Sequence, residues 1–218
     1  MMLGSSNAYR LAPCWLAPIG FGASLQYDLR MSQARIKPLS EDDYLAFEAA
    51  SALKHEFVGA RVYAMAGASA NHNRIAGNLY AKLLGSAPSD CQVFISDMKL
   101  RADAGASYYY PDVMAACDPQ DHDPYFRANP CLLVEVLSPA TEAIDRREKL
   151  IAYQKLSSLR EYLIMAQDVM RIELYRRLNA REWSLETLGA DDVLTLDCIA
   201  ISAPVAEFYR GVDFSLPR

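Results

Sequence analysis

Residues 108–153 read YYYPDVMAACDPQDHDPYFRANPCLLVEVLSPATEAIDRREKLIAY and contain two apolar runs, each with one carboxylate. Asp112 follows Pro111 at the start of the first run, and Glu135 lies inside the second, CLLVEVL. A carboxylate is costly to bury without a partner, so Glu135 indicates a functional group. A charged amphipathic helix carrying Lys149 follows. Two acids and a lysine on adjacent elements are the groups that metal-assisted phosphodiester hydrolysis requires.

Each of these residues also has an ordinary structural interpretation. Asp112 could be a turn aspartate after proline, which is common at strand ends. Asp145, Lys149 and Tyr153 are spaced four apart on the predicted helix and share one face, so Asp145 and Lys149 could form a surface ion pair. Glu135 has the weakest structural alternative, because it stands within a strand that is apolar on both faces and is therefore expected near the centre of a sheet.

The hydrophobic periodicity predicts an α+β (mixed α/β) chain with one sheet. Ser40 is expected to cap the first helix, and Gly59 and Ala60 are expected to form a hairpin turn. The predicted helices span 40–52, 70–84, 142–156 and 203–209, and the predicted strands span 57–63 (as a hairpin), 91–95, 98–101, 108–117, 131–137, 161–165, 170–175, 183–188 and 199–201.

Composition favours a single globular domain. The 218 residues are 52% hydrophobic and 22% charged, with a formal net charge of −5, so nucleic-acid binding would need a local basic patch. The sequence contains no uncharged apolar run of about 18 or more residues, so it does not predict a membrane span. We expect residues 1–34 to be a disordered or wrongly assigned extension, and residues 35–218 to form one domain.

The cysteines are five in number and scattered, without a CxxC pair, and the three histidines lack zinc-ligand spacing. This pattern predicts a reducing, cytoplasmic location and argues against a disulfide framework or a structural zinc site.

Three further residues are candidates for the same site. Glu56 could add an acidic group or could pair with Lys54 at a helix end. His72 could contact phosphate or could serve as a surface or capping residue, and Asp97 could be only an edge-strand charge. DNA contact would need cations, which occur in two groups: Arg146, Arg147, Lys149, Lys155 and Arg160, and Arg171, Arg176, Arg177 and Arg181. The tyrosines at 108–110 are expected mainly to pack, although one could stack on a base.

Several motifs together resemble the restriction-endonuclease-like family of bacterial proteins in the PD-(D/E)xK nuclease superfamily. The motifs are YPDV at 110–113, LVEVLSPAT at 133–141 and DRREKLIAY at 145–153, with support from Glu56, from NHNRIAGNL at 71–79 and from EYLI at 161–164. The resemblance covers about residues 39–214. It implies a restriction-endonuclease-like αβββαβ core, with a central mixed sheet flanked by helices and an N-terminal helix–hairpin extension.

The resemblance also implies a site that binds Mg²⁺, or alternatively Mn²⁺. Asp112 corresponds to the PD aspartate and Glu135 to the (D/E)xK glutamate, with the Val136 carbonyl as a further ligand. Leu137 occupies the usual lysine position, so the resemblance points to Lys149 on the next helix, with Lys155 as a poorer candidate.

The expected function is therefore that of a metal-dependent endonuclease that cleaves DNA, with no membrane partner. A homodimer would suit the cutting of two strands. The main alternative is a catalytically inactive nucleic-acid-binding or regulatory protein that retains the nuclease fold. A more distant alternative is a glycosidase-like hydrolase that uses the two carboxylates as acid and base.

Overall fold

The computed structural model describes residues 38–65, 67–139 and 141–215, which lie in one compact unit, Lys37–Arg218. The expectation for residues 1–34 falls outside the described residues. The elements are α1 (Glu41–Ala50), β1 (His55–Val58), β2 (Arg61–Ala64), α2 (Ala70–Ser86), β3 (Gln92–Ile95), β4 (Lys99–Ala102), η1 (Asp103–Gly105), β5 (Ser107–Tyr109), β6 (Val113–Ala116), β7 (Phe126–Arg127), β8 (Leu132–Val136), α3 (Glu142–Ile144), η2 (Asp145–Lys149), α4 (Leu150–Gln154), β9 (Glu161–Met165), β10 (Ile172–Arg177), β11 (Trp183–Leu188), β12 (Val193–Leu196), β13 (Ile201–Pro204) and α5 (Val205–Phe208).

The first helix and hairpin form where local signals predict them. Ser40 and Asp43 make a capping box at the start of α1, which satisfies backbone N–H groups that the helix leaves unpaired. In the β1–β2 hairpin, Val58 pairs with Arg61, and the two turn residues Gly59 and Ala60 both have positive φ. Such a two-residue turn matches the twist of antiparallel strands.

The strands of the described chain form three sheets rather than the single predicted one, although the mixed α+β fold class is confirmed. One sheet has the order β2-β1-β5-β4-β7, a second has the order β11-β10-β9-β8-β6-β3, and β12 and β13 form a third. In the six-stranded sheet, β8 pairs antiparallel with β6 and parallel with β9. The carboxylate-bearing strand β8 is therefore an interior strand, as expected.

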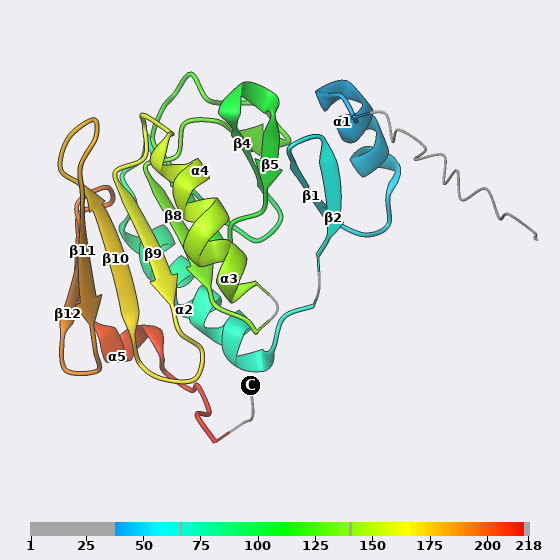
Figure 1. Cartoon of the computed structure of the whole chain (residues 1–218). Helices are drawn as coiled ribbons and strands as arrows, with labels where there is room; N and C mark the ends of the chain where they lie inside the picture. Colours follow the sequence, from blue (N-terminus) through cyan, green and yellow to red (C-terminus); the bar gives the residue numbers. More distant parts are fainter. Residues whose placement is uncertain (1–37, 66, 140, 216–218) are drawn as a thin grey trace, which may run out of the picture. The chain divides into compact units, whose positions relative to one another are not determined.

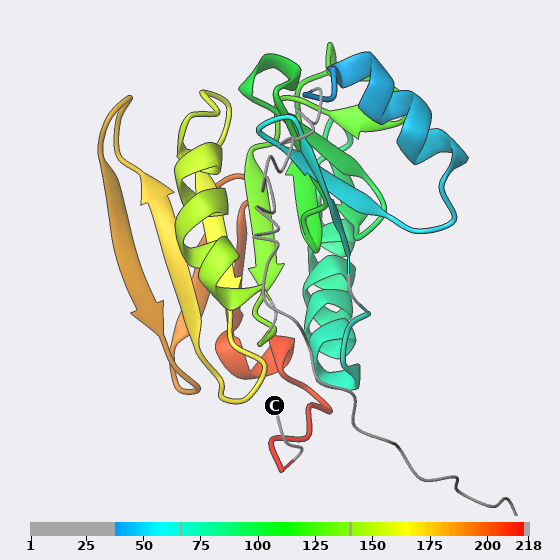
Figure 2. The ribbon, with the colours of Figure 1, turned by 45° about the vertical axis from the view of Figure 1, so that its right-hand side comes forward.

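Two helical layers cover opposite faces of the six-stranded sheet, with α2 on one face and α4 on the other (Figures 1 and 2). Side chains alternate along β8: Leu132 and Val134 belong to the core beneath α2, whereas Leu133 packs with Tyr153 of α4. The same alternation directs Glu135 toward the α4 face.

The prediction of one strand over residues 108–117 is wrong. The chain leaves the five-stranded sheet after β5 and enters the six-stranded sheet at β6. Pro111 lies in this crossing and has no N–H to give to a ladder, which favours a break between strands. The break places Asp112 immediately before β6.

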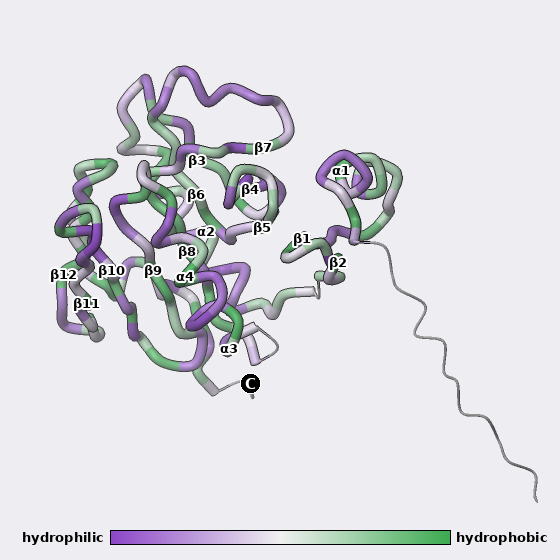
Figure 3. The backbone as a smooth tube through the Cα atoms, turned by 45° about the horizontal axis from the view of Figure 1, so that its top comes forward, coloured by the Kyte–Doolittle hydropathy of each residue, from purple (hydrophilic) through white to green (hydrophobic). Residues whose placement is uncertain are grey.

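The predicted helix over residues 142–156 is also not continuous. A π-helical segment, η2, separates α3 from α4. Its sequence, DRREK, is hydrophilic and appears in purple beside α4 in Figure 3. Both of its end residues, Asp145 and Lys149, are buried. Single π turns of this kind occur frequently at functional sites.

The cysteine prediction also requires correction. Cys91 forms a disulfide with Cys117, and Cys131 forms one with Cys198. The partners are far apart in sequence, so no short motif marks them. Pairing of β3 with β6 and of β6 with β8 brings Cys91, Cys117 and Cys131 together.

Candidate active site

Asp112 is joined to the end of β8. The Val136 backbone N–H donates to Asp112 Oδ2 at 2.7 Å, and His72 Nε2 lies 3.2 Å from the same oxygen. The Asp112 side chain is 17% exposed, so solvent reaches it. The break before β6 thus places one carboxylate beside the backbone that follows Glu135.

Glu135 is held by two side chains from the covering helix. Lys149 Nζ donates to Glu135 Oε1 at 3.1 Å, and the Tyr153 hydroxyl donates to the same oxygen at 2.7 Å. All three residues are buried. The buried strand therefore tolerates this acid because a charged donor and a neutral donor compensate it.

Lys149 contacts three carboxylates that come from separate parts of the chain. Besides Glu135, its Nζ lies 3.0 Å from Glu56 Oε1 and 3.3 Å from Asp145 Oδ1. Glu56 belongs to β1 of the five-stranded sheet, so one ammonium links both large sheets to η2. The Asp145 contact is close enough for ionic attraction but is not aligned as a hydrogen bond, and Oδ1 is buried without a hydrogen-bond partner among the described residues.

Burial and charge shift the pKa values of this cluster. Burial raises the pKa of Glu135 well above its ordinary value, opposed by Lys149 and reinforced by Asp145 and Asp112. Burial alone would lower the pKa of Lys149, but Glu135, Glu56 and Asp145 together hold it well above its usual range. Three carboxyl groups therefore surround one ammonium and stabilise its charged form.

His72 lies at the start of α2, where the Ser69 hydroxyl accepts a hydrogen bond from its backbone N–H at 3.0 Å. Burial would lower the pKa of the His72 ring, but the hydrogen bond and charge of Asp112 raise it, helped by a hydrogen bond to the Val136 backbone. The ring thus faces both Asp112 and the end of β8. This position is not a surface one.

The donor set suits a hard divalent cation. In the described chain, the hydrogen bonds to Glu135 fall on Oε1 and the contacts to Asp112 fall on Oδ2, which leaves the second oxygen of each carboxylate for a ligand. No compact group of three acidic, histidine or cysteine ligand atoms forms around them within the described ranges. Mg²⁺ usually takes one or two protein carboxylates together with water, so two donors fit it.

Some predicted candidates lie apart from this cluster. Asp97 forms an ion pair with Lys54, and Lys155 Nζ lies 3.5 Å from Asp103 Oδ2. The interpretation of Asp97 as a surface charge is therefore favoured, and Lys155 does not replace Lys149. The pairing of Lys54 with Asp97 also removes it as the partner of Glu56.

The predicted basic groups are largely engaged with other protein groups. Arg146 contacts Glu142 and Glu173, and Arg177 donates to backbone carbonyls including Leu159 O at 2.6 Å. The side chains of Arg147 and Arg160 are exposed. The tyrosines at 108–110 are all buried, so they pack rather than present a face to a base.

Asp145 and Tyr153 are the members of the cluster that sequence reasoning did not assign to the site. Their spacing of four from Lys149 indicated a shared face, but the interpretation of Asp145 and Lys149 as a surface pair is wrong, since both are buried. The apolar positions around them could have shown that this face meets the sheet.

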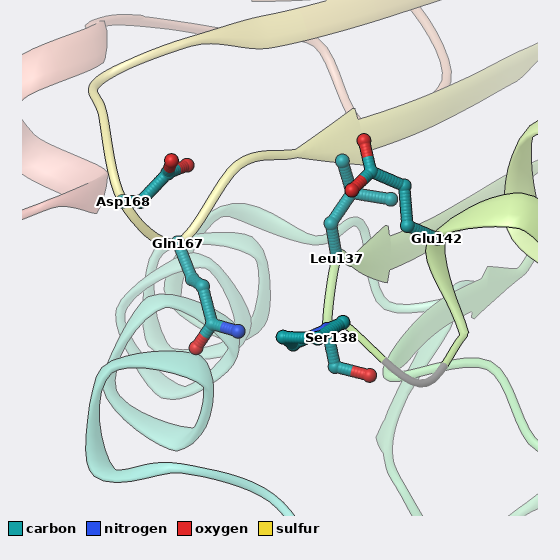
Figure 4. Close-up of a pocket in the computed structure, with 6 residues that line it drawn as sticks. Leu137, Ser138, Glu142, Gln167 and Asp168 are labelled. Carbon is teal, nitrogen blue, oxygen red and sulfur yellow. The ribbon is translucent and has the colours of Figure 1, made fainter. Parts of the chain in front are cut away.

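A small pocket lies just beyond the end of β8, with a volume of about 20 Å³, enough for one water molecule. In Figure 4 the Gln167 side chain points toward Ser138 across this pocket, and Glu142 and Leu137 line its other side. Asp112 and Glu135 do not line it. The pocket therefore lies next to the carboxylate cluster but does not contain the proposed catalytic residues.

Comparison with known proteins relates the fold of this chain to that of a described nuclease-like protein. The structure superposes on a crystal structure from Anabaena variabilis described as a putative nuclease belonging to DUF820, with a TM-score of 0.63 and 13% identity over 79% of this chain and 98% of that one. At that identity the likeness establishes the fold. The chain itself belongs to the Uma2 family, described as "Putative restriction endonuclease", whose model matches residues 41–206.

Two uncharacterized proteins of Synechocystis sp. are similar in sequence. One is 36% identical over 178 residues, which is 81% of this chain and 94% of the relative. The other is 38% identical over 167 residues, which is 74% of this chain and 94% of the relative. None of the helices in the described residues is long and apolar enough to cross a membrane.

Proposed function

We propose that this protein is a Mg²⁺-dependent endonuclease that hydrolyses DNA phosphodiester bonds, with Mn²⁺ as an alternative metal. The observation that carries the proposal is the meeting of Asp112, at the start of β6, with the end of β8 that bears Glu135. Family membership supports the same reaction class. A sugar hydrolase has no comparable support.

The two carboxylates would hold the metal, and the Val136 carbonyl is a candidate third ligand. When bound, Mg²⁺ would lower the pKa of a coordinated water and offset the charge of the scissile phosphate. The Val136 N–H fixes Asp112, and Lys149 and Tyr153 fix Glu135, so both carboxylates are oriented before any ligand arrives. Such preorganisation avoids a reorganisation cost during the reaction.

Lys149 is proposed to act through its charge. Its nearest partners are carboxylates, so it orients Glu135 and limits repulsion among the acids. That charge also favours developing negative charge on a phosphoryl group at the same site. His72 is placed where it could contact a phosphate that approaches Asp112.

One observation favours a second function, a nucleic-acid-binding protein without cleavage activity. Glu135 is only 3% exposed and Lys149 only 4% exposed, which restricts the access of a substrate to both. Cleavage and binding are separable by experiment.

The test is cleavage of supercoiled plasmid in Mg²⁺, in Mn²⁺ and in EDTA, with metal binding followed by isothermal titration calorimetry. Asp112→Asn should weaken metal binding and lower the cleavage rate by roughly 100-fold or more. The matched control is Asp97→Asn, an exposed acid paired with Lys54, which should leave both unchanged. DNA binding that persists in EDTA without cleavage in either metal would replace the nuclease proposal with the binding protein.

A further inference from the structure

Cysteine side chains gather at the end of the central strands that lies opposite the candidate active site. Cys117 directly follows β6 and Cys131 directly precedes β8, whereas Asp112 precedes β6 and Glu135 is near the end of β8. Cys198 lies between β12 and β13. The two clusters therefore occupy opposite ends of the same pair of strands.

The sulfur atoms are as close as the ligands of one metal ion. Cys117 Sγ and Cys131 Sγ are 3.6 Å apart, although they belong to different disulfides, and the sulfurs of Cys117, Cys131 and Cys198 all lie within 4.8 Å of one another. A tetrahedral zinc ion with Zn–S bonds of about 2.3 Å places its sulfurs about 3.8 Å apart. Cys91 lies outside this group of three but is bonded to Cys117, so it can supply a fourth sulfur from the neighbouring strand.

The backbone holds these residues in place independently of the sulfur–sulfur bonds. The Cys131 N–H donates to Ala115 O at 2.8 Å, and the Cys131 carbonyl accepts from Glu161 N at 3.2 Å. The buried Glu161 carboxylate accepts from the Cys198 N–H at 3.1 Å. Opening the disulfides therefore leaves Cys131 and Cys198 beside each other.

We infer that the reduced protein binds one zinc ion through Cys117, Cys131 and Cys198, with Cys91 as the fourth ligand. Thiolate sulfur is a soft donor that suits zinc. The strand pairing that brings Cys117 beside Cys131 also places them within reach of Cys198, so one ion can contact all three sulfurs. The ion would tie the β12–β13 hairpin to the sheet that carries Asp112 and Glu135.

Zinc binding requires that both disulfides are first reduced to thiols. Each disulfide takes two electrons from a trialkylphosphine, and one water supplies the two thiol protons and the oxygen of the phosphine oxide. Four thiols then bind Zn²⁺ as four thiolates and release four protons to the buffer. Zinc uptake is therefore pH-dependent.

The experiment starts with the full chain, reduced by phosphine, loaded with ZnCl₂ and freed of excess metal by gel filtration. Elemental analysis should find about one zinc per chain, and zinc should protect these cysteines from alkylation, as counted by mass spectrometry. Cobalt replacement should give a thiolate-to-cobalt charge-transfer band in the wild-type protein, a measurement that requires no variant. Cys198→Ser should lose most of the zinc, and Cys14→Ser, at the fifth cysteine, should keep it.

A reduced chain that folds but takes up no zinc and gives no cobalt band would overturn the inference and leave two disulfides as the state of the cluster. Retention of zinc by both Cys198→Ser and Cys131→Ser would overturn it as well. Neither result bears on the nuclease proposal, because Mg²⁺ binding at Asp112 is measured separately at the opposite end of the strands.

Discussion

Replacing Lys149 by methionine removes the only cation in direct contact with Glu135 among the described residues, with little change in volume. The three N···O separations are 3.0, 3.1 and 3.3 Å. At an effective dielectric constant near 20, each corresponds to an attraction of about 5 kcal/mol. The desolvation of the buried ions offsets much of this sum, and breaking a buried pair costs about 3–5 kcal/mol in measured cases. We expect Lys149→Met to lower the free energy of unfolding by that amount.

The assay is urea denaturation in EDTA, followed by far-UV circular dichroism. Lys155→Met is the matched control: Lys155 follows α4, its side chain is 60% exposed, and its loss should cost no more than about 0.5 kcal/mol. The double variant Lys149→Met/Glu135→Gln should be more stable than Lys149→Met, because the second substitution removes the carboxylate that the first leaves without a cation. A Lys149→Met protein as stable as the control would refute the view that this ammonium compensates the buried carboxylates.

Two further predictions concern Glu41, whose carboxylate accepts hydrogen bonds from Arg101 and from the Tyr108 hydroxyl. These bonds, Arg101 first, hold the pKa of Glu41 below its ordinary value of 4.5. The contribution of ionised Glu41 to the free energy of unfolding is therefore complete above pH 4.5. It is lost as the pH falls through the lower pKa of the folded state. Glu41→Gln should cost about 1–2 kcal/mol at pH 7 and less below pH 4, as measured by urea denaturation across pH; an equal cost at both would contradict the assignment. Gly105→Ala should cost about 1–3 kcal/mol in thermal unfolding, because φ there is +94° and the new Cβ would collide with the Glu41 carboxylate, and an unchanged melting temperature would count against that geometry.

Local signals made part of the fold predictable from the sequence. The Ser40 cap, the Gly59–Ala60 turn and the apolar stripe of α2 each lie within a few neighbouring residues, and each element forms where expected. The break at Pro111 was not predicted, because an apolar run on both sides looks like one strand. Strand β12 was missed because its exposed and buried residues alternate over only four positions.

In the candidate site, too, some residues were predictable from their neighbours in sequence and others were not. Glu135 was conspicuous because its neighbours along the strand are apolar, and Lys149 followed from helix spacing and family resemblance. Asp145 is buried at the start of the π segment, and no residue pattern predicts that segment. The pairing of the cysteines depends on the order of the strands. The sequence separation of Cys131 and Cys198 therefore gave no indication that they are partners.

Glu56 on the β1 hairpin contacts Lys149 beside the six-stranded sheet, so the cluster joins the two large sheets. The complete cluster exists only after both large sheets have formed and docked, because each supplies part of it. Metal binding at the cluster would thus report on completed tertiary structure as well as on chemistry. Variants far from the cluster that loosen the docking of the hairpin should therefore weaken metal binding without changing a ligand.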